Sequence, residues 1–512
     1  MGGCSSKPMS WAQLFTKKSV ASIQQEYHQG ELKKTLGPLN LVSLGVGAII
    51  GAGIFVITGQ AAATSAGPAV ILSFAIAGIV CVFAGLCYAE LASVLPVSGS
   101  AYTYSYATLG EIFAWIMGWL LLLEYGIAAS TVAVGWSGYL TSFLSDYGVN
   151  VPAQLAQSTI QFTEQGFAAT SNVNLVAALG ILGVTALLTL GVRESASVNN
   201  VIVAIKVVVL LTFIMIGASF VNPQNWTPFV PPPTGKFGEF GVSGIFLAAS
   251  TIFFAYVGFE AVSTAAGEAK NPQRDLPIGI IGSLLICTGL YVATTLVLTG
   301  VVPFRELNHP EPMAVAVDVM GIGWFSAAIK IGAVTGLSSV MLILCYAQTR
   351  VFYQMARDGL LPDTFGRIHQ RLKTPASGTL ILGIVIACAA GTLPLGILGD
   401  LVSLGTATAF LIVCVSVIYL RNHSPELHRP FRVPLGGFRI RGVWIGWTPL
   451  LGILGCIVLI APLLTEKVTS ALAGNPLPLM ILLGYFAVGA AIYAFFGFHN
   501  SRVTHPPTDP GA

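Results

Sequence analysis

Glycines gather in the middle of one apolar stretch near the N-terminus. Residues 45–55 read GVGAIIGAGIF, so that Gly45, Gly47, Gly51 and Gly53 fall close together. Each glycine costs a helix interior about 1 kcal/mol relative to alanine. The G-x-x-x-G spacing suits close packing of two membrane helices, but four glycines exceed what packing requires. The other interpretation is an unwound stretch whose freed N–H groups bind an anion and whose freed C=O groups bind a cation. Such a site suits a zwitterion.

Three ionisable residues lie well inside apolar stretches, away from their ends, where a charge is costly and marks a candidate functional group. They are Lys206 in VAIKVVV, Glu124 in LLLLEYG and Glu260 in YVGFEAV. Burial disfavours the charged form of such groups, so each is a candidate for exchanging a proton near neutral pH. The structural alternatives are a cation bonded to backbone carbonyls for Lys206 and hydrogen-bonded carboxyl groups for the two glutamates.

Histidines are missing from the apolar stretches. All seven lie in loops, in the termini or just past the last stretch: His28, His309, His369, His423, His428, His499 and His505. Intramembrane zinc and haem sites usually need histidine ligands, and the chain has neither a C-x-x-C pair nor a P-loop sequence. We therefore expect no metal site, no cofactor, no ATP hydrolysis and no enzymatic activity.

The composition places these residues in a membrane protein. The chain has 512 residues, of which 54% are apolar and 9% are charged, against about 25% charged residues in soluble domains. A window of about 20 apolar residues, enough to span a bilayer, recurs twelve times. The predicted spans are 41–64, 68–95, 110–143, 174–192, 197–220, 242–266, 277–302, 323–356, 377–395, 399–420, 447–465 and 477–497. The expected fold is an all-α polytopic membrane protein with 12 transmembrane helices.

The distribution of positive charge predicts the orientation of these spans. With both termini on one side, that side holds nineteen of the 24 Lys and Arg residues, and the other side holds Lys236, Arg305 and Lys467. Because cytoplasmic loops are rich in Lys and Arg, we expect both termini to be cytoplasmic in a multi-pass protein of the cell membrane. The opening MGGCSS fits a myristoylation pattern at Gly2 with a palmitoylation candidate at Cys4, and the sequence leaves open whether either residue is lipidated.

A weak internal symmetry relates the first span to the sixth. The sixth contains TIFFAYVGFEAVSTAAGE, in which Gly258 and Glu260 interrupt an apolar run. Successive spans cross the membrane in opposite directions. Because five is an odd number, a repeat offset by five spans has the inverted orientation. Two interrupted hydrophobic segments at matching positions of inverted halves are typical of a transporter's binding site.

Four motifs in order resemble the bacterial members of the cationic amino acid transporter family, in the amino acid–polyamine–organocation superfamily. They are LKKTLGPLNLVSLGVGAIIGAGIFVITGQAAATSAGPAV, the run from CYAELASVLPVSGS to VAVGWSGYL, FFAYVGFEAVSTAAGEAKNPQRDLPIGI and RVFYQMARDGLLP. The resemblance covers about residues 30–497 and implies a leucine-transporter-type fold with spans 1 and 6 broken mid-membrane. The implied regions are a cytoplasmic segment 1–40, a first five-helix repeat 41–221, a second inverted repeat 240–421, two further spans within 447–497 and a cytoplasmic tail 498–512.

The resemblance also implies a substrate site at the two breaks. The broken part of span 1 is the GAGIF segment, which begins at Gly51. There the N–H groups of Ala52 and Gly53 hold the substrate carboxylate, and the carbonyl of Ile49 accepts from its ammonium. The matching break in span 6 falls at residues 254–257, where the carbonyls of Phe254, Ala255 and Val257 take the remaining ammonium donors. Phe254 is in addition the expected aromatic gate.

Lys206 resembles the span 5 lysine that replaces a sodium ion in proton-coupled relatives. The resemblance implies that its ammonium faces carbonyls near Gly47 and the hydroxyl of Ser338 or Ser339.

One residue departs from the animal members of the family. Leu344 stands where they have a small serine, and leucine fills the space that an arginine or lysine side chain would need. A steric change of this size is worth about 1–3 kcal/mol. We therefore expect small neutral amino acids such as alanine to be preferred over arginine and lysine.

These observations together predict proton-coupled symport of L-amino acids by alternating access, with Lys206 as the coupling group. The expected partners are an amino acid, protons and membrane lipids, without nucleic acid, while a small accessory subunit is left open. An exchanger or a sodium-coupled transporter of the same fold is the nearer alternative. A sensor without flux or a channel is the alternative of a different class, although a channel would need a continuous polar lining.

Overall fold

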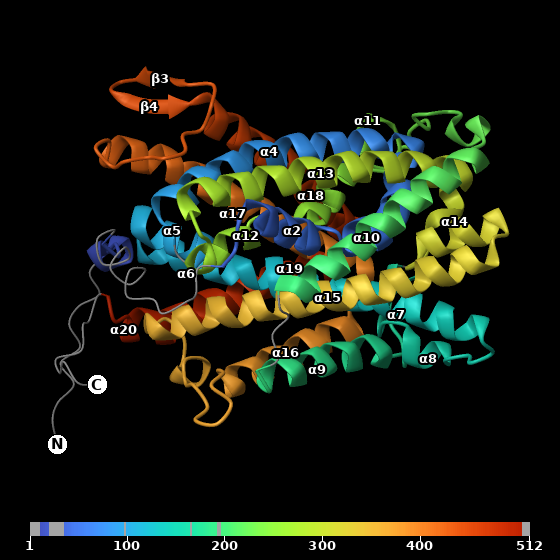
Figure 1. Ribbon diagram of the computed structural model, residues 1–512, viewed down its shortest axis with the longest axis horizontal. Coiled ribbons are helices and arrows are strands. Elements are labelled where there is room, and N and C mark those ends of the chain that lie inside the picture. Colours follow the sequence, from blue (N-terminus) through green and yellow to red (C-terminus); the bar gives the residue numbers. More distant parts are fainter. Residues whose placement is uncertain (1–10, 20–34, 97–98, 164–165, 192–195, 504–512) are drawn as a thin grey trace.

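The computed structural model describes residues 11–19, 35–96, 99–163, 166–191 and 196–503, and these residues are almost entirely helical (Figure 1). Among them, nine helical segments are long and apolar enough to cross a membrane, and two shorter apolar helices, Leu175–Thr189 and Ala376–Thr392, accompany them. The longest segment, Pro38–Val94, has 57 residues and contains two of the predicted spans. The chain is thus a helical membrane protein, while the number of twelve spans and the two repeats stay predictions.

The first half of the chain forms a series of helices with several short irregular turns. Its α-helices are α2 (Pro38–Ile49), α3 (Thr58–Ala61), α4 (Val70–Val94), α5 (Ser100–Thr108), α6 (Glu111–Leu121), α7 (Ala128–Asp146), α8 (Ala153–Ala156), α9 (Leu175–Thr189) and α10 (Ala196–Gly217). Its 3-10 and π-helical segments are η1 (Trp11–Phe15), η2 (Gly53–Ile57), η3 (Ala62–Ala66), η4 (Gly67–Ala69), η5 (Leu122–Ile127), η6 (Ala218–Phe220) and η7 (Pro223–Trp226).

The second half follows the same plan. Its α-helices are α11 (Gly241–Ile252), α12 (Ala261–Thr264), α13 (Pro272–Val301), α14 (Pro312–Met320), α15 (Gly323–Arg357), α16 (Ala376–Thr392), α17 (Leu395–His423), α18 (Trp447–Leu472), α19 (Leu477–Ile492) and α20 (Phe498–Asn500). Its shorter segments are η8 (Phe253–Tyr256), η9 (Ala265–Glu268), η10 (Phe304–Leu307), η11 (Asp363–Phe365) and η12 (Tyr493–Gly497).

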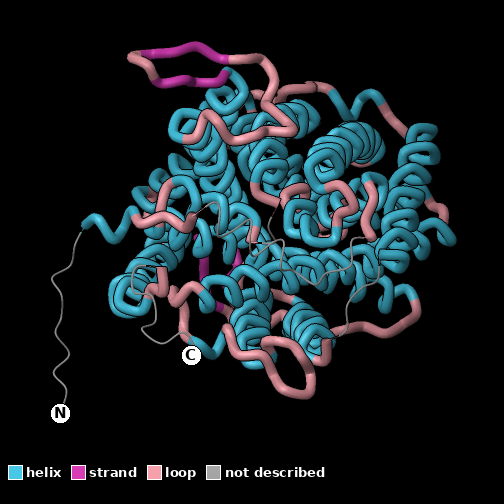
Figure 2. The backbone as a smooth tube through the Cα atoms, turned by 60° about the vertical axis from the view of Figure 1, so that its left-hand side comes forward, coloured by secondary structure: helices cyan, strands magenta, loops and turns pink. Residues whose placement is uncertain are grey.

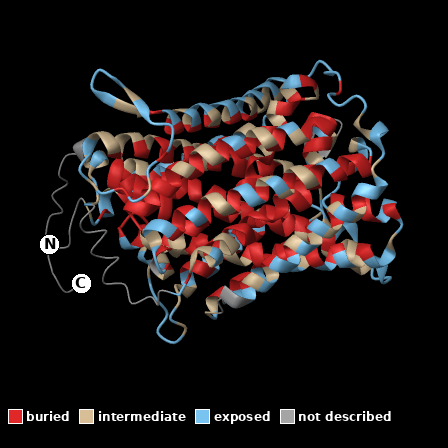
Figure 3. Ribbon diagram, turned by 45° about the horizontal axis from the view of Figure 1, so that its top comes forward, coloured by how far each residue is buried: buried red, intermediate tan, exposed pale blue. Residues whose placement is uncertain are grey.

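The long helices run side by side and enclose a buried centre. α13 packs along α4 and α2, α15 packs along α7 and α10, and α16 packs along α9. Buried residues concentrate between these helices, while exposed residues lie at the perimeter and at both ends (Figure 3). Of the most apolar window of each helix, 78% is buried in α17 but only 17% in the segment that contains α19. α17 is therefore central, and α19 is peripheral.

One end of the helices gathers segments that are far apart in the sequence. η1, α20 and the hairpin of β3 (Gly437–Ile440) and β4 (Val443–Gly446) all lie there (Figure 1), and the hairpin projects from the helices (Figure 2). The antiparallel pair β1 (Ile160–Thr163) and β2 (Gly166–Ala169) forms the other two-stranded sheet. Neither hairpin is predicted by the sequence, which indicates only loops at these places.

The segment between spans 2 and 3 differs from its expected position. Its tyrosines suggest an interfacial segment at headgroup level, but α5 is buried throughout. Two of its three tyrosine hydroxyl groups find carboxylate partners within the protein. Tyr102 donates to Asp358 at 2.9 Å, and Tyr106 donates to Glu111 at 3.0 Å.

Candidate functional site

The first break interrupts the helix in which the glycines gather. α2 ends at Ile49, and Ile50 adopts an extended conformation with φ −70° and ψ 94°. Helical structure resumes at Ala52 and continues as the π-helical segment η2. The first N–H groups of a helical segment have no partner within it, so Ala52 and Gly53 present donors at the break. The chain is unwound at this point, as the glycines predict.

The second break lies slightly later in the chain than the resemblance implies. Residues 253–256 form the single 3-10 turn η8, after which Val257 is extended with ψ 134°. Gly258 follows with φ 122°, a conformation that is available mainly to glycine. The residues between η8 and α12 that are not helical are therefore 257–260, and Gly258 takes the dihedral angles that only glycine accepts without strain.

The two breaks lie directly against one another. A Cβ atom added to Gly53 would lie 2.3 Å from both the Cα and the Cβ of Ala255. A Cβ atom added to Gly258 would lie 2.7 Å from the carbonyl carbon of Ala48. Real Cβ atoms essentially never approach other atoms below 3.0 Å, so both positions require glycine. The structure thus brings the predicted site residues of the two helices together.

A tyrosine that the sequence analysis missed joins the two breaks. Tyr291 of α13 is fully buried, and its hydroxyl oxygen lies 2.7 Å from the carbonyl oxygen of Ile49 and 3.0 Å from that of Ala255. Its single proton is therefore shared between two carbonyl acceptors. The sequence offers one signal that could have found Tyr291, namely a tyrosine within an apolar stretch. A buried phenolic hydroxyl usually needs a hydrogen-bond partner.

Phe254 and Leu344, two further predicted site residues, are also buried. Phe254 is 4% exposed; its N–H donates to the Ser403 hydroxyl at 3.1 Å, and its carbonyl accepts from the N–H of Val257 at 3.0 Å. One of its carbonyl lone pairs is thus used within the turn. Leu344 of α15 is 2% exposed.

Lys206 extends from α10 to the helix that carries the first break. It is fully buried, and its ammonium nitrogen lies 2.7 Å from the carbonyl oxygen of Gly47. The stem of the lysine passes Gly336 of α15, where a Cβ atom would lie 3.1 Å from its methylene carbons. The lysine therefore connects α10 and α2 beside α15, at the carbonyl that the resemblance implies.

The two serines of α15 have different surroundings. The hydroxyl of Ser338 donates to the carbonyl of Val334 at 2.8 Å and accepts from the indole N–H of Trp136 at 2.9 Å. Ser339 is 5% exposed on the same helix. Of the two alternatives that the resemblance leaves open, Ser338 is thus hydrogen-bonded within α15 and to Trp136 of α7.

The two buried glutamates differ in their hydrogen bonding. Both carboxylate oxygens of Glu260 accept from the N–H of Gly258 at 3.0 Å, so Glu260 caps the second break. Glu124 lies in the π-helical segment η5, is fully buried, and neither of its oxygens has a hydrogen-bond partner among the described residues. Buried polar atoms are nearly always paired, so Glu124 is a candidate functional group on structural grounds as well.

The remaining glycines of the cluster have packing roles. A Cβ atom at Gly45 would lie 2.4 Å from the Ser283 hydroxyl oxygen, and one at Gly47 would lie 2.7 Å from Val203. At Gly51 the nearest atom would be a methyl of Val340 at 3.2 Å. Gly45 and Gly47 therefore allow close packing of helices, whereas Gly51 and Gly53 lie at the break in span 1. Within the described part of the chain, His, Cys, Asp and Glu side chains form no group of three or more that could hold a metal ion.

Comparison with known proteins shows the family of the chain. The profile of the family described as "Amino acid permease" matches residues 36–494. The chain is 45% identical to the branched-chain amino acid permease BcaP of Bacillus subtilis over 96% of this chain and 99% of the relative.

Two further relatives are named for other substrates. A methylthioribose transporter of Bacillus subtilis is 46% identical over 82% of this chain and 88% of its own length. The vacuolar cationic amino acid transporter 4 of Arabidopsis thaliana is 39% identical over 81% of this chain and 68% of its own length. The chain therefore belongs to the amino acid permease family, and it is a membrane transporter related to the cationic amino acid transporters rather than an enzyme.

Proposed function

We propose that the protein imports neutral aliphatic L-amino acids together with a proton, by alternating access around the two helix breaks. The observation that supports this proposal best is the juxtaposition of unpaired N–H groups at Ala52 and Gly53 with the carbonyls of Ile49 and Ala255, which Tyr291 bridges. The N–H groups suit a carboxylate. Each carbonyl oxygen has two lone pairs, so it can accept from a substrate ammonium beside the tyrosine hydroxyl.

The side-chain preference follows from the apolar residues near the site. Leu344 is buried and offers no charge to a guanidinium, and an unpaired charge against an apolar wall is costly. Alanine is the expected small substrate. The name of the 45% identical relative, a branched-chain amino acid permease, supports extending the substrate class to valine, leucine and isoleucine. Arginine and lysine are then excluded.

A second candidate substrate comes from one relative only. The methylthioribose transporter is 46% identical to this chain, which favours testing methylthioribose as well. This sugar has neither carboxylate nor ammonium, so the two breaks would offer it fewer complementary groups than they offer an amino acid.

Lys206 is the proposed coupling group. Its bond to the Gly47 carbonyl holds α2 against α10, and loss of its proton on the cytoplasmic side would release this hold and let the inner gate open. Glu124 and Glu260 are further candidates for carrying the proton. The same proposal places both termini on the cytoplasmic side of the cell membrane and divides the first ten spans into two inverted repeats.

Uptake into proteoliposomes tests the proposal. Labelled alanine and leucine should accumulate when an inward proton gradient is applied, and arginine and methylthioribose should compete poorly. Equal uptake with and without the gradient would contradict coupling but not transport. Stimulation by preloaded amino acid would indicate an exchanger, dependence on sodium would indicate a sodium-coupled transporter, and binding without flux would indicate a sensor.

A variant pair tests the role of the lysine. Lys206→Ala should abolish accumulation and leave part of the substrate binding, because the lysine touches the backbone of α2 rather than the proposed substrate groups. Lys236→Ala is the matched control, since Lys236 is an exposed lysine whose ion pair within the described residues is with Glu239, three positions along the chain. Unchanged accumulation in Lys206→Ala would remove the lysine from the mechanism.

A further inference from the structure

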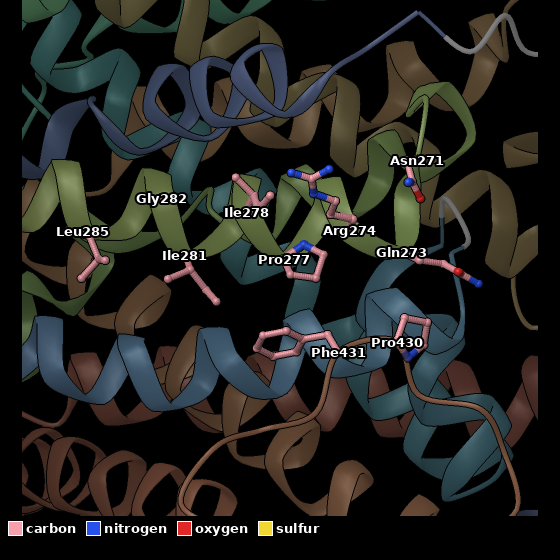
Figure 4. A pocket seen from close by; sticks show the side chains of 10 residues that line it. All are labelled: Asn271, Gln273, Arg274, Pro277, Ile278, Ile281, Gly282, Leu285, Pro430 and Phe431. Atoms are coloured by element: carbon pink, nitrogen blue, oxygen red, sulfur yellow. The ribbon is translucent and has the colours of Figure 1, made fainter.

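A groove of about 610 Å³ lies on the outside of α13, away from the two helix breaks (Figure 4). Its α13 side is polar at the beginning of the helix and apolar further along. The polar part consists of Asn271, Gln273 and Arg274, and the apolar part of Pro277, Ile278, Ile281, Gly282 and Leu285. Pro430 and Phe431, from the segment that precedes β3, form the opposite wall, and the ring of Phe431 faces Pro277 and Ile281.

The opposite wall is held in place by buried contacts with α4. The N–H of Val433 donates to the Glu90 carboxylate at 2.7 Å, and the N–H of Phe431 donates to the Ser93 hydroxyl at 3.4 Å. The guanidinium of Arg429 is buried and donates to the backbone carbonyls of Ser424 and Leu427 in the same segment and of Leu420 in α17. The groove is therefore a built feature of the fold, because its second wall is fixed on both sides of Phe431.

Arg274 supplies an uncompensated positive charge at one end of the groove. It is exposed, and its guanidinium forms no ion pair or hydrogen bond with any residue that the structure describes. The nearest carboxylate in sequence, Asp275, is buried and accepts from the N–H of Asn271 at 3.2 Å. The groove thus combines one open cation with a long apolar surface.

The dimensions of the groove match one leaflet of a bilayer. From Arg274 to Leu285, a helix rises about 16 Å at 1.5 Å per residue, which is close to half of the hydrocarbon core of about 30 Å. α13 has 30 residues and is therefore about 45 Å long, enough for its first turns to reach the headgroup region. Ile278 and Leu285 are exposed to 39% and 57%, on the outer surface of the helix bundle.

We infer that this groove binds an anionic phospholipid of the leaflet that faces the β3–β4 hairpin. The phosphate lies at Arg274 with Asn271 and Gln273 as neutral donors, and one acyl chain lies between α13 and Phe431. Further arginines of the same end, Arg432, Arg439 and Arg441, are exposed and raise the local concentration of anionic lipid. The lipid would thus join α13, the helix that carries Tyr291, to the segment that follows α17.

Native mass spectrometry of the purified protein tests this site, with phosphatidylglycerol and phosphatidylethanolamine of identical acyl chains as probes. The wild type should retain one phosphatidylglycerol with at least about tenfold preference over phosphatidylethanolamine. Arg274→Gln should lose the preference, and Ile278→Trp, which fills the apolar part, should lose the bound lipid of either type. Arg439→Gln is the control on the same face and should behave like the wild type.

Three results would overturn the inference. The first is an unchanged preference in Arg274→Gln, and the second is an equal loss in Arg439→Gln, which would indicate a diffuse cationic surface. The third is displacement of the lipid by soluble glycerol phosphate, which would show that the apolar groove does not take part. If Arg274→Gln does not fold, Ile278→Trp is a sufficient test by itself. Retention of phosphatidylglycerol by Ile278→Trp would then overturn the inference.

Discussion

Gly53 is the residue at which the two helix breaks touch. Its substitution by alanine would place a Cβ atom 2.3 Å from the backbone of Ala255, so the two breaks would have to separate. We expect Gly53→Ala, and more strongly Gly53→Val, to lower the affinity for alanine at least about tenfold, which corresponds to 1.4 kcal/mol. Binding to the purified protein, measured by calorimetry or thermal shift, checks this expectation.

Gly289 of α13 provides the matched control for this prediction. It is a helical glycine with open space around the position of a Cβ atom, so Gly289→Ala should keep wild-type binding and gain stability, by up to about 1 kcal/mol. Retained alanine binding in Gly53→Val would count against the proposed site.

Tyr291 allows a second test at the level of single atoms. Tyr291→Phe keeps the ring but leaves the buried carbonyls of Ile49 and Ala255 without their shared donor, which costs about 1–3 kcal/mol. The apparent melting temperature in detergent should fall. Tyr147→Phe should leave it unchanged, because Tyr147 is 68% exposed. A melting temperature that is equal in Tyr291→Phe and the wild type would mean that the bridge contributes nothing.

Single residues show what the sequence could predict about the site and what it could not. The glycine cluster predicts the first break because glycine disfavours helix locally, and Lys206 stands out because a charge is rare in an apolar span. Tyr291 lies far along the chain from both breaks, and nothing in its neighbours indicates which carbonyls it reaches. Such a partner depends on the packing of α13 against α2, which periodicity does not encode.

At the scale of elements, helical irregularity concentrates around the candidate site. The π-helical segments η2 and η5 and the 3-10 turn η8 carry Gly53, Glu124 and Phe254, respectively. π-helical turns occur frequently at functional sites. Length and hydropathy predict apolar helices, of which the described residues form nine long enough to cross a membrane and two shorter ones. They do not predict a change of helix type within a span. The buried position of α5 was likewise missed, since its carboxylate partners come from other elements.

Glu311, just before α14 and outside the candidate spans, allows a test of how burial changes the pKa of a carboxyl group. Glu311 precedes this helix beside Gly138, and burial raises the pKa of its carboxyl group, while His309 and Lys330 act in the opposite direction. A carboxyl group with a raised pKa in the folded state stabilises the fold below its unfolded pKa and loses this contribution as pH rises through the folded pKa. We expect Glu311→Gln to be more stable than the wild type at pH 8, with a smaller difference at pH 4.

Melting curves of both proteins at the two pH values check this prediction. Glu306→Gln is the control, because Glu306 is an exposed glutamate in the same loop. A wild type that gains stability relative to Glu311→Gln as pH rises would show that the ion pairs outweigh burial at this position.

At the scale of the whole molecule, different charged contacts join the helices at their two ends. At the end that carries η1 and α20, contacts join segments far apart in the sequence: Lys18 pairs with Asp358 at 3.2 Å, and the N–H of Arg502 donates to the Asp358 carbonyl at 2.9 Å. At the other end, Lys330 is buried and pairs with Asp146 at 2.7 Å. The sequence predicts which loops are basic, but the pairing of these charges depends on how the helices are arranged.

Glu90 is the carboxylate on which the first of these ends depends most. It is 1% exposed and accepts two bonds from Arg421, at 2.8 and 2.5 Å, and one from the N–H of Val433, so it joins α4 to α17 and to the wall of the groove. Removing one partner of a buried ion pair costs about 3–5 kcal/mol, because the other charge stays buried and unpaired. We therefore expect Glu90→Gln to lower the apparent melting temperature by several degrees.

The exposed pair of Lys236 and Glu239 separates the effect of burial from the effect of charge. The Lys236 ammonium lies 3.4 Å from the Glu239 carboxylate, and the two side chains are 80% and 39% exposed. Exposed ion pairs contribute about 0–1 kcal/mol to stability. The melting temperature of Glu239→Gln should therefore be close to that of the wild type. If the unpaired arginine causes the loss in Glu90→Gln, adding Arg421→Gln should restore part of the stability. A double variant less stable than Glu90→Gln would instead show that Arg421 stabilises the fold mainly through its contact with the ring of Trp444, 4.3 Å from the guanidinium carbon.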